Sequence, residues 1–276
     1  MRVDAEAANQ YPCFECSFVK PLRPFKELVD TIETVLLGED YMVRSGVLSS
    51  KVVCGTPMER RRWYCVGIAS RVYIGSFCWP EPTSDAIPLR SLVPVLGPEE
   101  WAPHPPVTAS AKSKTALALG YTNVAAAYKE FAAIGGNPFE ETIIVDVGCS
   151  EKFRIWKKDV CPTITRTSGG AHRFWDSVKG GLLSNRDMAK LMGFNSMHWP
   201  FEAHMTDRQF GLAIGNGCSV STLNKLIPEV LYSAGSISLA TKELLLGRAA
   251  AYQRSLVGNG PKPFFVPQKT SGPRSD

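Results

Sequence analysis

The sequence predicts an α/β protein, because helical and strand patterns alternate along its first part. Residues 24–41 carry apolar side chains at three- and four-residue spacing, which is typical of an amphipathic helix, and Gly38 is expected to end it. Runs of β-forming residues follow at 41–48, 61–70 and 72–79, and each run predicts a strand.

The middle of the chain repeats this alternation on a smaller scale. An alanine-rich stretch at 123–136 predicts a helix that ends at a glycine pair, and residues 141–149 predict a strand. The strand runs into Asp146-Val-Gly148-Cys, which is similar to the glycine-rich cofactor loop of some methyltransferases. Ser150 and Glu151 stand where that loop needs a second glycine, so we expect a buried strand that ends in a turn.

Two segments are expected to lack regular structure. Eight of the twenty prolines fall within residues 79–107, where they should interrupt helices and strands. Residues 247–276 are basic and rich in glycine and proline, and they predict a flexible tail.

The composition describes a globular chain. Of its 276 residues 44% are hydrophobic and 21% charged, which suits one or two packed domains and excludes a disordered chain. The net charge of +5 suits a polyanionic partner without identifying one. No signal peptide is visible, and no apolar run approaches the roughly 20 residues of a membrane helix. We therefore expect a soluble, intracellular protein without a membrane partner.

The cysteines predict no metal site. Only Cys13 and Cys16 form a C-x-x-C pair, and no second cysteine pair or suitably spaced histidine pair completes a zinc ligand set. Cysteines within apolar runs, such as Cys65, are expected to be small core residues in a reducing compartment.

Four blocks of sequence lie in a recognisable order. They are PCFECSFVKP at 12–21, GTPMERRRWYCVGIAS at 55–70, GLLSNRDMAKLMGFNS at 181–196 and IGNGCSVSTLNKLIPEVL at 214–231. Their order and separation resemble the C-terminal portion of the DNA (cytosine-5) methyltransferases. The resemblance implies a partial Rossmann-like methyltransferase catalytic domain with an inserted, irregular α+β target-recognition region.

The first two blocks carry the catalytic positions that the resemblance implies. Glu15 matches the glutamate of the family's Glu-Asn-Val signature, and Arg60 and Arg62 match its Pro-Gln-x-Arg-x-Arg arginines. Methylating carbon 5 of cytosine needs a thiolate nucleophile, an acid at ring nitrogen 3 and cations near the developing negative charge. Glu15 would be the acid and the two arginines the cations, although Met58 replaces the family's glutamine. The alternative for Arg60 and Arg62 is a solvated charge run.

The last two blocks carry the positions near the cofactor. Gly215 and Asn216 match the family's Gly-Asn turn beside S-adenosyl-L-methionine, with Ala213 in place of its glutamine. Ordinary turn chemistry would also explain this Gly-Asn pair. Arg186 and Asp187 match the family's helix before Gly-Phe-Pro, and a structural salt bridge is their alternative role.

A DNA-reading region is expected between these halves, because the target base must be flipped out of the duplex. CPTITRTSGG at 161–170 resembles the family's threonine and glycine segment, so Thr163, Thr165 and Arg166 are candidate contacts to double-stranded DNA. A threonine-rich strand and turn explains the same residues equally well.

The predicted division follows from these blocks. Residues 1–79 would be the second half of the catalytic domain, 80–170 the target-recognition region, 171–246 the return to the catalytic domain and 247–276 the tail. The first block begins a dozen residues from Met1, which leaves no room for the family's glycine-rich loop and Pro-Cys nucleophile. Pro12-Cys13 lies too close to Glu15 to replace that nucleophile loop.

Two functions therefore remain open. One is a methyltransferase portion that acts only with a missing N-terminal segment or a partner subunit, in the nucleus if the source is eukaryotic. The other is a catalytically inactive DNA-binding or regulatory module. If half of the catalytic domain is missing, the apolar stripe of residues 220–231 is expected to leave a hydrophobic patch beside Asn216, next to an incomplete parallel sheet. Its members are Val220, Leu223, Leu226, Ile227, Val230 and Leu231.

Overall fold

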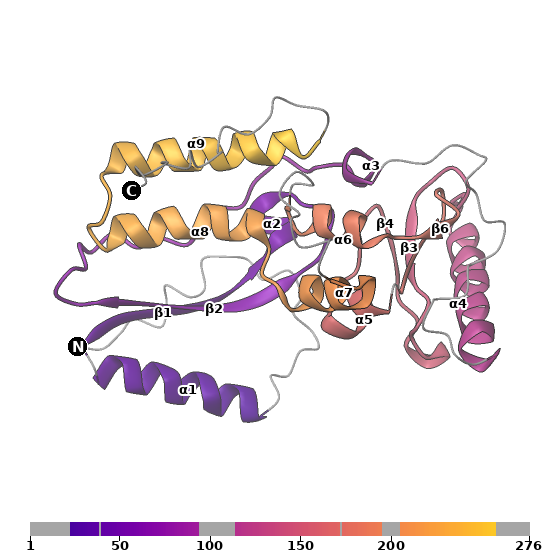
Figure 1. The fold of residues 1–276 in the computed structure, drawn as a ribbon, viewed down its shortest axis with the longest axis horizontal. Coiled ribbons are helices and arrows are strands. Elements are labelled where there is room, and N and C mark those ends of the chain that lie inside the picture. Colours follow the sequence, from indigo (N-terminus) through magenta and orange to yellow (C-terminus); the bar gives the residue numbers. More distant parts are fainter. Residues whose placement is uncertain (1–22, 39, 94–113, 172, 195–204, 258–276) are drawn as a thin grey trace, which may run out of the picture.

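The computed structural model describes residues 23–38, 40–93, 114–171, 173–194 and 205–257. A long hairpin with its helices lies at one end of the molecule and a small sheet with one long helix lies at the other (Figure 1). Short helices join the two ends, and the candidate site is built in this joining region.

The hairpin confirms three of the predicted elements. Helix α1 covers Arg23–Gly38, strand β1 covers Tyr41–Ser49 and strand β2 covers Arg61–Ala69. The strands pair antiparallel along their whole length, from Tyr41 opposite Ala69 to Ser49 opposite Arg61. Helix α2, Ser50–Cys54, lies between them in the chain.

Helices lie on both faces of this hairpin. Helix α1 contacts β1 on one side, and helix α8, Val220–Ser233, contacts β2 on the other (Figure 1). The core on the α8 side contains Leu48, Val66, Ile68 and Leu226. The apolar stripe of α8 is only partly covered, because Leu226 is buried whereas Ile227 is 48% exposed.

The strand predicted at 72–79 is wrong. This segment is irregular, and the amide of Ile74 donates to the carbonyl of Ser233 at the end of α8, 3.0 Å away. Tyr73, Phe77 and Trp79 pack against the hairpin core, and Gly46 on β1 leaves room for the Trp79 ring. The three aromatic side chains therefore serve packing, whereas Val72 and Ile74 are exposed.

The opposite end is a four-stranded sheet in the order β4-β3-β5-β6. Its strands are β3 (Ile143–Asp146), β4 (Trp156–Lys158), β5 (Phe174–Asp176) and β6 (Gly181–Leu182), with the 3-10 turn η3 (Glu151–Phe153) between β3 and β4. All three pairings are antiparallel. The sheet combines strands from both sides of the boundary predicted at residue 170.

The predicted alanine-rich helix packs on this sheet. Helix α4 covers Lys114–Ala133, so it begins earlier than the sequence pattern indicates. Val124 and Phe131 of α4 share a core with Val145 and Trp175 of the sheet. Strand β3 is buried at every position and ends in a turn at Gly148, as expected.

The joining region consists of four short helices around a third core. They are α3 (Leu89–Leu92), α5 (Arg166–Gly170), α6 (Asn185–Leu191) and α7 (Asp207–Asn216). Their core contains Met58, Ile144, Ile164 and Met188. Reciprocal capping boxes begin α5, α6 and α7, because Thr165, Ser184 and Thr206 each cap the residue three positions later.

The flexible tail does not begin at residue 247 as predicted. Helix α9 covers Leu239–Ser255 and lies along α8 (Figure 1). Lys242 binds Glu229 on α8 at 3.2 Å, and the Tyr252 hydroxyl donates to the carbonyl of Gly193 at 2.9 Å. The first contact holds the start of the helix and the second its last turn, and composition alone reveals neither.

The mixed α/β class is confirmed, but a Rossmann-like sheet is not shown. Every named strand in the described residues pairs antiparallel, so the expected parallel sheet is absent from that part of the chain. Within the same residues, none of the helices combines the length and apolar character that crossing a membrane requires.

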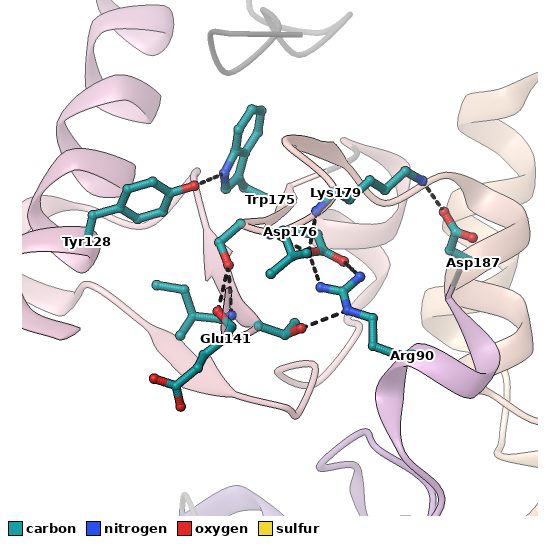
Figure 2. Close-up of polar contacts among 11 residues, drawn as sticks. Arg90, Tyr128, Glu141, Trp175, Asp176, Lys179 and Asp187 are labelled. Atoms are coloured by element: carbon teal, nitrogen blue, oxygen red, sulfur yellow. Dashed lines mark hydrogen bonds and ion pairs between the residues drawn. The ribbon is translucent and has the colours of Figure 1, made fainter. Parts of the chain in front are cut away.

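A buried ion pair connects the joining region to the small sheet (Figure 2). Arg90 on α3 binds both carboxylate oxygens of Asp176 on β5, at 2.8 and 2.6 Å, and its Nε donates to Thr142 at 2.7 Å. Asp176 is fully buried and also accepts from the amides of Val178 and Lys179. The carboxylate therefore has its hydrogen-bonding capacity met within the fold.

We expect the substitution Asp176→Ala to lower the free energy of unfolding by about 1–3 kcal/mol, because it leaves the amides of Val178 and Lys179 and the partly buried Arg90 guanidinium without their acceptor. Urea unfolding followed by circular dichroism measures this loss. As a control, Lys158→Ala removes an exposed ion pair with Glu141 and should leave the unfolding midpoint nearly unchanged. Equal losses in the two variants would contradict a structural role for the Arg90–Asp176 pair.

Candidate functional site

Two of the resembling blocks lie side by side, although about a hundred residues separate them. The amide of Cys161 donates to the carbonyl of Pro57 at 2.8 Å, and the amide of Glu59 donates to the carbonyl of Cys161 at 3.1 Å. The Thr163 hydroxyl donates to the carbonyl of Glu59. Residues 57–60 and 161–164 thus run parallel, with Met58 opposite Cys161.

Arg60 joins this pair of segments to a third one. Its side chain is buried, and its guanidinium donates to the carbonyls of Ile164, Gly215 and Gly217. The distance to Gly215 is 2.9 Å. The guanidinium of Arg60, the residue just before β2, therefore connects that strand to the segment leading into α5 and to the turn between α7 and α8.

The charge of Arg60 is offset by these backbone dipoles. Burial lowers the pKa of Arg60 to about 10, and the neighbouring charge of Arg62 acts in the same direction, so the guanidinium remains protonated at neutral pH. Two of its acceptors lie at the C-terminal end of α7, where the helix dipole favours a cation. Its Nε has no hydrogen-bond partner among the described residues. In this arrangement Arg60 holds backbone, because both of its terminal nitrogens donate to carbonyls.

Arg62 and Asn216 occupy different positions. Arg62 lies on β2 opposite Leu48, and it is only partly buried. Asn216 is the last residue of α7 and is exposed. Because its φ is not positive, the left-handed turn that a Gly-Asn pair permits is not what the structure uses here.

Gly215 lies at a close contact between two helices. A Cβ atom at Gly215 would lie 2.2 Å from the carbonyl oxygen of Thr165. The same close approach recurs one turn away, where Gly169 and Gly211 would each place a Cβ 2.3 Å from the other's carbonyl oxygen. Helices α5 and α7 therefore touch through glycines, and the contact of Gly215 with a cofactor stays a prediction.

The threonine segment combines capping with backbone pairing. Thr165 caps α5, and its hydroxyl accepts from the amide of Ser168 at 3.2 Å. Arg166 is the first residue of α5 and is exposed. Thr163 and Thr165 thus have partners within the fold, whereas the Arg166 side chain reaches the surface beside them.

The other predicted residues have different outcomes. Glu15 lies outside the described residues. Asp187 caps α6 and accepts from the Lys179 ammonium at 2.9 Å, which is the structural alternative expected for it (Figure 2). Met58, which stands where the family has glutamine, is fully buried in the central core. An apolar contact therefore takes the place of a side-chain amide.

Sequence reasoning did not identify Ile164, Gly169 and Gly211 as parts of this site. Ile164 contributes only its carbonyl, for which a sequence carries no signal. The capping pattern Thr165-x-x-Ser168 and the small residues at 169, 211 and 215 were visible in the sequence and indicate a helix start and a close helix contact.

The described cysteines are weak nucleophiles where they are buried. Burial raises the pKa of Cys54 to about 11 and also raises the pKa of Cys65, Cys149 and Cys161. Cys218, next to Gly217, is exposed. No cluster of three or more metal-ligating side chains exists among the described residues.

The contact between α5 and α7 predicts a difference between two glycine substitutions. Gly215→Ala must push apart the backbones of two helices, which typically costs about 1–3 kcal/mol. Gly247→Ala on α9 meets no atom within 4 Å, and there alanine should stabilise the helix by about 0.5–1 kcal/mol. Thermal unfolding of both variants measures the difference, and a Gly215→Ala protein as stable as the parent would contradict the close contact.

Comparison with known proteins leaves the site to be interpreted on its own geometry. No protein-family model matches the chain, and no curated protein matches it significantly. The resemblance described above therefore rests on the quoted residues and on where the structure puts them.

Proposed function

We propose that this chain is a DNA (cytosine-5) methyltransferase-like protein that binds double-stranded DNA and S-adenosyl-L-methionine at the junction around Arg60. The observation that carries the proposal is the meeting of separate sequence blocks there. Arg60 joins residues 57–60 to 163–166 and to 215–217. The carbonyl of Met192, at the end of α6, accepts from the amide of Val220 at the start of α8, which brings in the remaining described block.

The DNA side of the proposal rests on the start of α5. The exposed Arg166 lies at the first position of this helix, beside the buried backbone junction. An exposed guanidinium can bind phosphate with two parallel hydrogen bonds. The partly buried Arg62 is a second candidate contact, and the net charge of +5 favours a polyanion.

The cofactor side of the proposal rests on Asn216. Its side-chain amide is exposed at the end of α7 and can donate and accept hydrogen bonds to a polar ligand. Gly215 supports this position indirectly, because it lets α7 approach Thr165. S-adenosyl-L-methionine would supply the methyl group, and this chain would contribute the surface that orients it.

The second candidate is a DNA-binding or regulatory module without catalysis. It is favoured by the state of Arg60, whose terminal nitrogens are engaged by backbone carbonyls instead of facing a cytosine. The raised pKa of the buried thiols points the same way. Glu15, the proposed acid at ring nitrogen 3, is needed by the first candidate alone.

Duplex binding should weaken steeply with salt, since it would be dominated by phosphate contacts. Arg166→Ala should weaken it at low salt and reduce the slope of log affinity against log salt by about one unit. Arg62→Ala should act in the same direction. Fluorescence anisotropy with a labelled duplex measures both effects.

The matched control for this experiment is Lys129→Ala, which removes one exposed positive charge from α4, at the far end of the molecule (Figure 1). It should change affinity less than Arg166→Ala does. An undetectable interaction at low salt, or equal losses in all three variants, would count against a DNA site at α5.

The chain alone should transfer no methyl group to DNA, because its matching blocks include no Pro-Cys nucleophile at the family's distance from Glu15 and because burial disfavours the thiolate at Cys54 and Cys161. The measurement is incorporation of label from S-adenosyl-L-methionine into duplex DNA. Incorporation above background would decide for the catalytic candidate. If Cys13→Ser abolished such incorporation, Pro12-Cys13 would be the nucleophile loop.

A further inference from the structure

We propose that Arg60 is a positioning residue that couples the segment leading into α5 to the turn between α7 and α8, so that loosening one of them loosens the other. This inference rests on the proposed function only in identifying the segment with DNA and the turn with the cofactor. The coupling itself follows from hydrogen bonds that the described residues make.

The first step is that one rigid group serves both segments. The Arg60 Nη1 atom donates to Ile164 and its Nη2 atom donates to Gly215 and Gly217. A guanidinium is planar, so its donors cannot turn toward one segment while keeping their geometry toward the other. A shift of the Ile164 carbonyl is therefore felt at Gly215 and Gly217.

The second step is that the guanidinium has no alternative environment. Arg60 is 1% exposed, so water does not replace a lost carbonyl. If the segment before α5 moved away, a buried N–H group of Arg60 would lose its hydrogen-bond acceptor. The three carbonyls are therefore held in place together.

The third step is that both segments continue directly into ligand-facing positions. Ile164 precedes the cap Thr165 and the exposed Arg166. Gly215 and Gly217 flank the exposed Asn216, and the exposed Cys218 follows them. If the proposed function holds, DNA at Arg166 and cofactor at Asn216 should each tighten binding of the other by the same factor.

The test perturbs one segment and observes the other. Thr165→Ala removes the cap of α5, and the rate at which a thiol reagent labels Cys218 in the full-length chain is measured by peptide mass spectrometry. Coupling predicts that Thr165→Ala changes this rate by about five-fold or more. Ser238→Ala removes the corresponding cap of α9, which no hydrogen bond joins to Arg60 in the described residues, and should leave the rate unchanged.

The same pair of measurements is then made with Arg60→Lys. Lysine keeps the charge, but a single ammonium cannot span the three carbonyls. The effect of Thr165→Ala at Cys218 should largely disappear in this background. An effect of equal size in the parent chain and in the Arg60→Lys variant would overturn the proposal, because it would mean that the helix contact between α5 and α7 transmits the change by itself.

Two further measurements complete the experiment. If Arg60→Lys does not fold, the NMR signals of the Arg60 guanidinium decide: Thr165→Ala must shift them and Ser238→Ala must not, and signals unmoved by Thr165→Ala reject the coupling. Separately, duplex affinity is measured with and without S-adenosylhomocysteine. A chain that binds neither ligand refutes the proposed function, while the labelling of Cys218 still decides the role of Arg60.

Discussion

The hydrogen bonds from one buried guanidinium to three backbone carbonyls are the constraint on which the joining region depends. A charged group at 1% exposure requires nearby acceptors, and Arg60 obtains them from Ile164, Gly215 and Gly217. The chain must therefore bring a segment near residue 164 and the end of α7 to the start of β2. Glycine at 215 is the condition for this approach, since any side chain there would meet the carbonyl of Thr165.

Different combinations of apolar and polar contacts attach the two ends of the molecule to this junction. The hairpin end relies mainly on apolar contacts between β2 and α8, and Lys225 on α8 adds a hydrogen bond to the carbonyl of Val53 at 2.7 Å. The sheet end shares the central core through Ile144 and Phe174, and it is also held by the bidentate pair of Arg90 and Asp176. Bidentate geometry fixes orientation as well as distance, so the short helix α3 is aligned with β5 (Figure 2).

Periodicity was enough to predict α1, β1, β2, α4 and β3, because each of these elements carries a long or uniformly apolar pattern. It failed at 72–79, whose backbone bonds to Ser233, and at 247–255, where α9 is held by distant partners such as Gly193. In the site, the importance of Arg60 and of Thr165 was predicted from the sequence. Their roles were not, because burial and carbonyl acceptors are properties of the folded chain.

These roles separate the predicted site into an inner and an outer set. Arg60 and Gly215 are buried and hold backbone segments together, and Thr165 caps α5, whereas the side chains of the exposed Arg166 and Asn216 adjoin them without a structural task of this kind among the described residues. Met58 belongs to the inner set, since a buried methionine needs no hydrogen-bond partner where a buried amide would need several. Methionine at position 58 therefore says little about catalysis, because catalysis would depend on side chains that contact a ligand. Residues that fix the backbone would serve a methyltransferase and a non-catalytic DNA-binding protein equally well. The two candidate functions therefore differ in the exposed groups and in the acid and thiol chemistry that they require, and not in the junction around Arg60.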